Sequence, residues 1–314
     1  MFLTGAPTTM PDLSCYTTNL LARLAPDIPE VRRRLARGVR LAVRTDLPAG
    51  ELAFSHHPRI DTTDDGRQLA YAGTRDWSTA REALHLALLQ HRRVLAVANT
   101  RHLPWSPAQG LADAPHWVLL EDRRDGQWLV ADHFSALTPN GMQRPYLGWI
   151  GDAELATALA PWTQPPQEVA RRDVLALGEE STIPPADHYR WLDWAPATDC
   201  GATPGTGTWV LDLDMSLRHT CEVLRANPAA VARYVDDLWA AARHHTFKLA
   251  LDAADGNTDP ARAAVASAAW DELPRAVRFA AQSTARGRPR PGAIERSVDQ
   301  LLTALRDLPA PDKE

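Results

Sequence analysis

The amino-acid sequence predicts an α+β fold, with a mostly antiparallel sheet in the first half of the chain and a largely helical second half. Short apolar runs bounded by turn residues, such as 94–99 (VLAVAN), are typical of buried strands. In the second half, apolar residues recur at helical spacing over 228–250, 260–284 and 292–307. The 314 residues are enough for two domains at about 150 residues each.

Predicted helices and strands alternate in the first half. Helices are expected at 15–25, 78–92 and 150–160, and the candidate capping residues are Ser14 or Asp12, Asp76 or Ser78, and Asp152. Strands are expected at 94–99, 116–122 and 127–132. The turn RRDG at 123–126 joins the last two strands, so they are predicted to pair as a hairpin.

A change in composition divides the chain. The stretch 161–207 is rich in Pro, Gly, Thr and Trp, which is typical of a connector that packs on the surface. One more strand is expected at 208–214, where alternation would turn Asp212 and Asp214 toward solvent. We therefore predict an α+β domain at 1–165, a connector at 166–207 and a mainly helical domain at 208–314.

Charge and cysteine content narrow the class of protein. The net charge of −5 argues against a general nucleic-acid binder, and no run of 18 apolar residues predicts a membrane-spanning helix. The amino-terminal segment lacks the basic stretch and apolar core of a secretory signal, so we expect a cytoplasmic protein. Three scattered cysteines are too few for a disulfide framework or a zinc site. No metal site is predicted, because the adjacent pairs His56–His57 and His244–His245 lack the spacing of metal ligands.

Three residues of the first half form a candidate reaction centre. Cys15 begins a predicted helix, where the helix dipole and unpaired backbone N–H groups favour a thiolate. His116 begins one strand of the predicted hairpin, and Asp132 ends the other. A three-residue loop closed by Gly126 would set His116 opposite Asp132, with Cβ atoms about 4.5–5.5 Å apart. A four-residue loop would set His133 opposite His116 instead.

Thiol chemistry needs these three residue types. An ordinary thiol has a pKa of about 8.5 and is only partly ionised at neutral pH, so a neighbouring imidazole must accept its proton. A carboxylate then orients the imidazole and stabilises the imidazolium. A helix-borne cysteine followed by strand-borne histidine and aspartate is the chain order of papain-like thiol enzymes. The order predicts a triad of Cys15, His116 and Asp132, and leaves Cys200 and Cys221 as plain thiols.

Three segments also resemble a known family. Residues 12–24 (DLSCYTTNLLARL), 94–105 (VLAVANTRHLPW) and 116–132 (HWVLLEDRRDGQWLVAD) resemble the amino-terminal domain of the butirosin biosynthesis protein H family. Members of that family are similar to papain-fold enzymes and act in natural-product pathways. The resemblance covers roughly residues 10–160 and implies a papain-like catalytic domain, with Cys15 as nucleophile, His116 as base and Asp132 as orienting acid.

The resemblance implies acyl transfer in antibiotic or other secondary metabolism. The acyl group would pass from the phosphopantetheine thioester of an acyl carrier protein to Cys15, and then to an amine or hydroxyl of a small-molecule acceptor. This chemistry needs no bound cofactor and no metal. Two alternatives stay open: a cysteine hydrolase (amidase, peptidase or thioesterase) with the same triad, and a non-catalytic module that binds a carrier protein or a peptide.

The chain departs from the family pattern at three points. Asp12, Leu13 and Ser14 precede the cysteine where the family has Gly and His, and Asn99 stands where an acidic residue is common. No Gln lies upstream of Cys15 to complete an oxyanion hole.

Further residues are candidates for binding. We expect the substrate to contact Asn99, His102, Trp105 and Tyr16. Two basic clusters, Arg32–Arg34 and the run Arg286, Arg288 and Arg290, are either solvated surface or a dock for an acidic carrier-protein helix.

Overall fold

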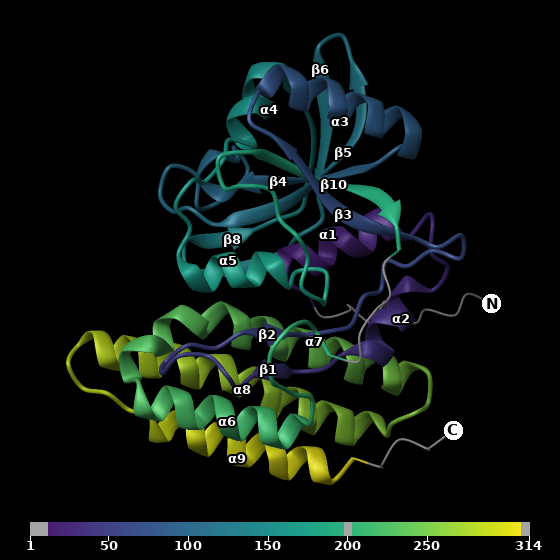
Figure 1. Ribbon diagram of the computed structural model, residues 1–314. Coiled ribbons are helices and arrows are strands. Elements are labelled where there is room, and N and C mark those ends of the chain that lie inside the picture. Colours follow the sequence, from purple (N-terminus) through teal and green to yellow (C-terminus); the bar gives the residue numbers. More distant parts are fainter. Residues whose placement is uncertain (1–11, 198–202, 309–314) are drawn as a thin grey trace.

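The computed structural model describes residues 12–197 and 203–308, in which a six-stranded sheet lies above a bundle of helices (Figure 1). The strand order of the sheet is β3-β10-β4-β5-β6-β9, and every neighbouring pair is antiparallel. Its strands are β3 (Arg67–Thr74), β4 (Val94–Asn99), β5 (Pro115–Arg124), β6 (Gln127–Asp132), β9 (Tyr146–Gly151) and β10 (Tyr189–Pro196). The predicted α+β class with a mostly antiparallel sheet is confirmed.

Each face of the sheet is covered by helices. Side chains at odd positions of β5, such as Trp117 and Leu119, share a core with α1 (Cys15–Leu24) and α2 (Val31–Gly38). Side chains at even positions, such as Val118, share a second core with α3 (Trp77–His91) and α4 (Asp152–Ala158). Because both faces are buried, these strands read as continuous apolar runs. Figure 1 shows α1 and α5 (Gln167–Val174) between the sheet and the bundle.

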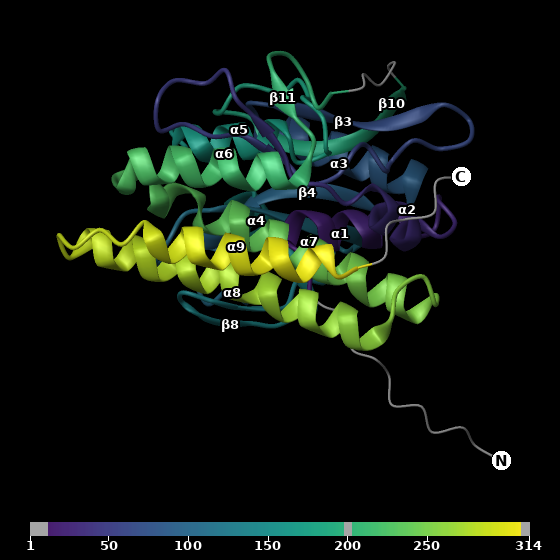
Figure 2. The same cartoon turned by 90° about the horizontal axis from the view of Figure 1, so that it is seen from below.

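The bundle contains the helices of the carboxy-terminal part. They are α6 (Leu213–Ala226), α7 (Val235–Ala254), α8 (Pro260–Ala285) and α9 (Gly292–Arg306), with the 3-10 helix η2 (Pro228–Tyr234) before α7. Figure 2 shows the bundle from below, with α9 alongside α8. The helices predicted at 228–250, 260–284 and 292–307 are therefore found, with the first beginning as a 3-10 turn.

A segment of the first half completes the bundle. Strands β1 (Ala42–Arg44) and β2 (Phe54–Ser55) pair with each other, and β1 also pairs with β11 (Trp209–Val210). Leu41, Val43, Leu52 and Phe54 are buried in the core of the bundle. The helical unit thus takes part of its core from residues that the predicted boundary assigned to the first domain.

Local predictions made from capping residues are largely confirmed. The side chain of Ser14 accepts a hydrogen bond from the N–H of Thr17 at the start of α1, and Asp76 caps α3 in the same way. Asp152 is the first residue of α4 rather than its cap, which is Gly151. Asp212 caps α6 instead of lying in a strand, so the predicted strand 208–214 ends at Val210.

The stretch 166–207, predicted to be a connector that packs on the surface, includes two regular elements. It contains α5, and β10 lies within it as an inner strand between β3 and β4. Two short strands outside the main sheet, β7 (Ala136–Thr138) and β8 (Gly141–Gln143), form a hairpin after β6. Across residues 12–197 and 203–308, no helix combines the length and apolarity needed to cross a membrane.

Candidate active site

Cys15 is the first residue of α1, directly after the Ser14 cap. Its thiol is partly exposed and free of any disulfide. The first N–H groups of a helix have no partner within the helix, and the dipole places partial positive charge there. Helix α1 is fixed at this end because the Thr17 hydroxyl donates to Nε2 of His244 on α7 at 2.9 Å, while Nδ1 of His244 donates to the Ala240 carbonyl. The start of α1 thus presents the Cys15 side chain beside backbone N–H groups that have no partner within the helix.

His116, near the start of β5, and Asp132, at the end of β6, form a buried pair. Nε2 of His116 lies 2.8 Å from Oδ2 of Asp132, and the two side chains are 5% and 0% exposed. Cys15 lies near the same imidazole, because its charge is one of the influences that raise the pKa of His116. Since Nε2 is held by the carboxylate, Nδ1 is the nitrogen left to exchange a proton with Cys15.

The predicted hairpin register is wrong, although the pair it was meant to explain does form. Asp125 and Gly126 have φ of 51° and 74° and make a two-residue turn, in place of the three-residue loop. A bulge between Leu120 and Asp122 then shifts the register, so that Leu119 pairs with Ala131. Continued to the strand ends, this register makes His116 and Asp132 diagonal neighbours on one face rather than direct partners.

Asp132 accepts hydrogen bonds from several directions. Its Oδ1 accepts from the Asn19 amide at 3.1 Å and from the Phe134 N–H at 3.0 Å. Its Oδ2 accepts from Nε1 of Trp105 at 2.9 Å and from the Gln143 amide at 3.3 Å, in addition to His116. Burial opposes ionisation of this carboxyl, but the charge and hydrogen bond of His116 and these donors outweigh it and lower the pKa of Asp132.

The charges of Asp132 and Cys15 also change the pKa of the His116 imidazole. Burial alone would lower the pKa of His116, but the negative charges of Asp132 and Cys15, with their hydrogen bonds, raise it to about 10. His116 is therefore an imidazolium at neutral pH, which suits a thiolate–imidazolium pair with Cys15. The Asp132 carboxylate stabilises this imidazolium through its charge and through the hydrogen bond at Nε2.

This linkage predicts a dependence of stability on pH. The pKa of His116 in the folded protein lies above the unfolded value of about 6.5, so protonation stabilises the fold. The contribution is complete below about pH 6.5 and is lost as the pH rises toward 10. Urea unfolding gives the free energy of unfolding of wild type and of His116→Gln. The difference between the two should shrink by more than about 1 kcal/mol as the pH rises over this range. A difference that does not change with pH would contradict a charged His116.

The four residues predicted to bind substrate have different surroundings. Tyr16 is buried, stacks on Trp117 with ring centroids 4.6 Å apart, and its hydroxyl donates to Asp173. Trp105 stacks on Tyr146 at 4.0 Å and points its indole N–H at Asp132. Tyr16 and Trp105 therefore have packing and positioning contacts within the protein.

Asn99 and His102 flank the turn after β4. Asn99 caps the 3-10 helix η1 (Thr100–His102), donates to Asp113, and lines a small pocket. His102 ends η1 and is partly exposed. Of the four predicted binding residues, Asn99 is the one that lines this pocket.

Two supporting residues were missed by the sequence analysis. Asn19 is one helical turn after Cys15, and its amide joins Asp132 to the carbonyls of Cys15 and Trp117. Its carbonyl accepts from the His133 N–H, so the end of β6 is tied to α1. The sequence does carry a signal for Asn19, because this amide stands four residues after the cysteine on an otherwise apolar helix face. Gln143, in the β7–β8 hairpin, gave no such signal.

His56, His244, His245 and Cys221 have packing roles. His56 and His244 stack with centroids 5.4 Å apart, and His245 stacks on Trp270 at 4.1 Å. Burial first, and then neighbouring charges, lower the pKa of His244 and His245 to about 3, so both are neutral. Within the described ranges no three potential ligands gather as a metal site requires. Burial raises the pKa of Cys221 to about 12, and Cys200 lies outside the described residues.

Comparison by sequence identifies no relative of this protein. No model of a known protein family matches the chain, and no curated protein matches it in sequence.

Proposed function

We propose that this protein is a cysteine-dependent acyltransferase with Cys15, His116 and Asp132 as its triad. The buried His116–Asp132 pair, which lies near enough to Cys15 for the charge of Cys15 to raise the pKa of His116, is the observation that supports this most strongly. A cysteine at a helix start, facing histidine and aspartate on neighbouring antiparallel strands, matches the papain-like arrangement that the sequence resemblance implies. We propose a papain-like fold for α1 and the sheet on the same grounds.

The proposed reaction has two half-reactions. The Cys15 thiolate attacks the carbonyl carbon of an acyl thioester, and collapse of the tetrahedral intermediate breaks the bond to the pantetheine sulfur. The departing thiolate takes the proton of the His116 imidazolium. An acceptor amine or hydroxyl then attacks the acyl-enzyme, its proton passes to His116, and the Cys15 thiolate leaves, which restores the starting pair.

Charge that develops on the carbonyl oxygen needs hydrogen-bond donors. The backbone N–H of Cys15, at the start of α1, is one candidate. The side-chain amides closest to the triad do not fit as the second donor, because Asn19 and Gln143 both donate to Asp132. The donor that papain-like enzymes take from an upstream Gln must therefore come from another group in this chain.

The proposal is tested by intact mass spectrometry of the protein after mixing with short acyl-pantetheine thioesters and with acyl carrier protein loaded with the same groups. We expect an added acyl mass, located on Cys15 by peptide mapping. Release of that mass that depends on added amine supports transfer, whereas equal release in water alone supports the hydrolase. Absence of an adduct with both kinds of donor would refute the acyl-enzyme and favour a binding module.

The two basic clusters differ in their partners. Arg33 pairs with Asp255, Arg34 donates to backbone carbonyls, and Arg32 lies over the Phe247 ring, so this cluster is occupied by the protein itself. At the turn between α8 and α9, a groove is lined by Phe279 and by arginines that form no ion pair with any described residue. These arginines are Arg286, Arg288, Arg290 and Arg296. We propose that this groove receives the acidic helix of the carrier protein.

Reversal of charge in the groove should lower activity with the loaded carrier protein and leave activity with free thioesters unchanged. In the double variant Arg288→Glu with Arg290→Glu, kcat/KM for the loaded carrier protein should fall about tenfold or more, mainly through slower association at low salt. kcat/KM for the free pantetheine thioester should not change. Arg37→Glu, at an exposed position on α2, is the matched control. Unchanged carrier kinetics would exclude the groove as the dock.

A further inference from the structure

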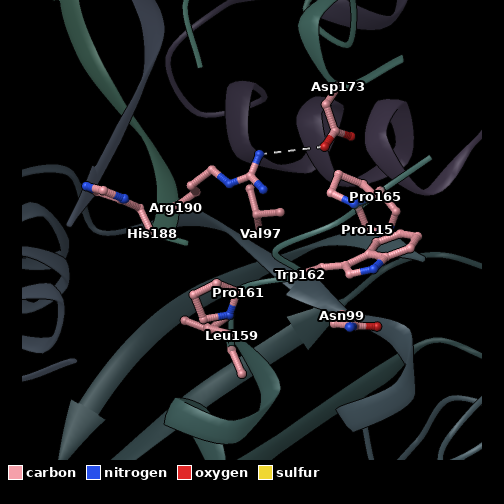
Figure 3. A pocket seen from close by; sticks show the side chains of 11 residues that line it. Val97, Asn99, Pro115, Leu159, Pro161, Trp162, Pro165, Asp173, His188 and Arg190 are labelled. Atoms are coloured by element: carbon pink, nitrogen blue, oxygen red, sulfur yellow. Dashed lines mark ion pairs between the residues drawn. The ribbon is translucent and has the colours of Figure 1, made fainter. Parts of the chain in front are cut away.

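A small pocket lies at the end of the sheet where β4 ends with Asn99 and β5 begins with Pro115 (Figure 3). Pro115, which precedes His116, lines it, and so does Asp173, which accepts a hydrogen bond from Tyr16, the neighbour of Cys15. The space that a water-sized group can occupy measures about 20 Å3 and is partly open to solvent. The remaining walls are mostly apolar, from Val97, Leu159, Ala160, Pro161, Trp162 and Pro165. A ligand group entering here would lie beside residues adjacent to both the nucleophile and the base.

Arg190 is the cationic group of this pocket. Its side chain is 10% exposed, and its ion-pair partner is Asp173, at 3.7 Å. That separation is too long for a hydrogen bond. Among the described residues, none accepts a hydrogen bond from the Arg190 guanidinium, while Tyr16 donates to the other oxygen of Asp173. The Arg190 guanidinium therefore has donors that a further acceptor, water or a ligand, can use.

The position of Arg190 is fixed by the sheet. It precedes Trp191, which pairs with Ala96 in β4, so Arg190 lies across from Val97 at the end of the strand. Figure 3 shows its guanidinium beside Val97, with Trp162 and Pro165 across the pocket. Burial raises the pKa of Asp173, against the Tyr16 hydrogen bond and the neighbouring arginine charges.

We propose that Arg190 binds a carboxylate of the substrate, so that either the acyl donor or the acceptor carries an acidic group. A guanidinium presents its donors as a planar fork that matches a carboxylate, and the pocket is too small for a larger anionic assembly. The identity of this carboxylate as part of an acyl donor or acceptor depends on the proposed acyltransferase function. The binding of a carboxylate by Arg190 does not depend on it.

Binding is tested first, without catalysis. Calorimetric titration with succinate and with succinamide compares wild type, Arg190→Gln and Arg190→Lys, with Arg75→Gln as a control at a 76% exposed arginine. We expect succinate to bind wild type and the control, succinamide not to bind, and Arg190→Gln to weaken succinate binding about tenfold or more. Arg190→Lys keeps the charge beside Asp173 and should recover part of the affinity. No binding of succinate to wild type, or equal binding to a folded Arg190→Gln, would overturn the proposal.

Activity measurements then show whether the carboxylate belongs to the acyl donor or to the acceptor. Acyl-enzyme formation is compared for succinyl- and butyryl-pantetheine, and acyl transfer is compared for glycine and glycinamide. A preference for the acidic probe that is lost in Arg190→Gln assigns the carboxylate to the donor or to the acceptor. If neither comparison shows a preference for the acidic probe, the proposed carboxylate of the substrate is overturned. If no thioester acylates Cys15, the proposed function fails, whereas the succinate titration still decides whether Arg190 is a carboxylate site.

Discussion

Replacement of Cys15 by alanine is expected to lower kcat/KM for acyl transfer by about 10⁴-fold or more, because no acyl-enzyme can form. The other described thiol offers no substitute. Cys221 is buried in the core of the bundle, and burial raises its pKa to about 12. The measurement is kcat/KM with loaded carrier protein, together with intact mass, for wild type and the variant.

The same experiment includes its own control. Cys221→Ser should leave kcat/KM unchanged, and Cys15→Ala should keep a melting temperature close to that of wild type, since the Ser14 cap and the core contacts of α1 remain. Turnover that survives in Cys15→Ala would show that the thiol is not the nucleophile. A loss in Cys221→Ser equal to that in Cys15→Ala would show that the two results reflect damage to the fold.

Elements with a strong local signal could be predicted from the sequence. Helix α1 has a capping serine and an apolar face, and β4 is a short apolar run between turn residues, so each was found near its true bounds. Strand β10 was missed because it is rich in tryptophan and surrounded by prolines, which is also typical of a connector. Its place is set by pairing with β3, more than a hundred residues earlier in the chain, and no local pattern contains that pairing.

The candidate site shows the same division. The types and chain order of Cys15, His116 and Asp132 were visible in the sequence, but the register that joins the last two was not. A two-residue turn and a bulge together changed the pairing without changing the face, so the two side chains still meet. The donors to Asp132 come from α1, from the loop after β4 and from the β7–β8 hairpin. That convergence is a property of the folded chain alone.

The number of donors around Asp132 predicts a second large effect. In Asp132→Ala, the buried imidazole and its neighbouring donors lose their common acceptor, and the free energy of unfolding should fall by about 3–5 kcal/mol. Asp132→Asn keeps the volume, but either orientation of the amide turns its N–H groups toward at least two donors, such as Asn19 and Phe134 or His116 and Trp105. We therefore expect Asp132→Asn to destabilise as well, though less than alanine.

Activity separates this positioning role from stability. Without the carboxylate, the pKa of His116 should fall and the imidazole should lose its fixed orientation, so kcat for Asp132→Asn should drop roughly 10²- to 10⁴-fold at a temperature where the variant is folded. The rate of Cys15 alkylation by iodoacetamide at pH 6 should fall too, because less of the thiol is held as the thiolate of an ion pair. Asp122→Asn, which removes a half-exposed carboxylate from the same hairpin, should change neither quantity. If Asp132→Asn kept wild-type kcat and alkylation, the His116–Asp132 pair would be a structural ion pair, and the proposed triad would have to be abandoned.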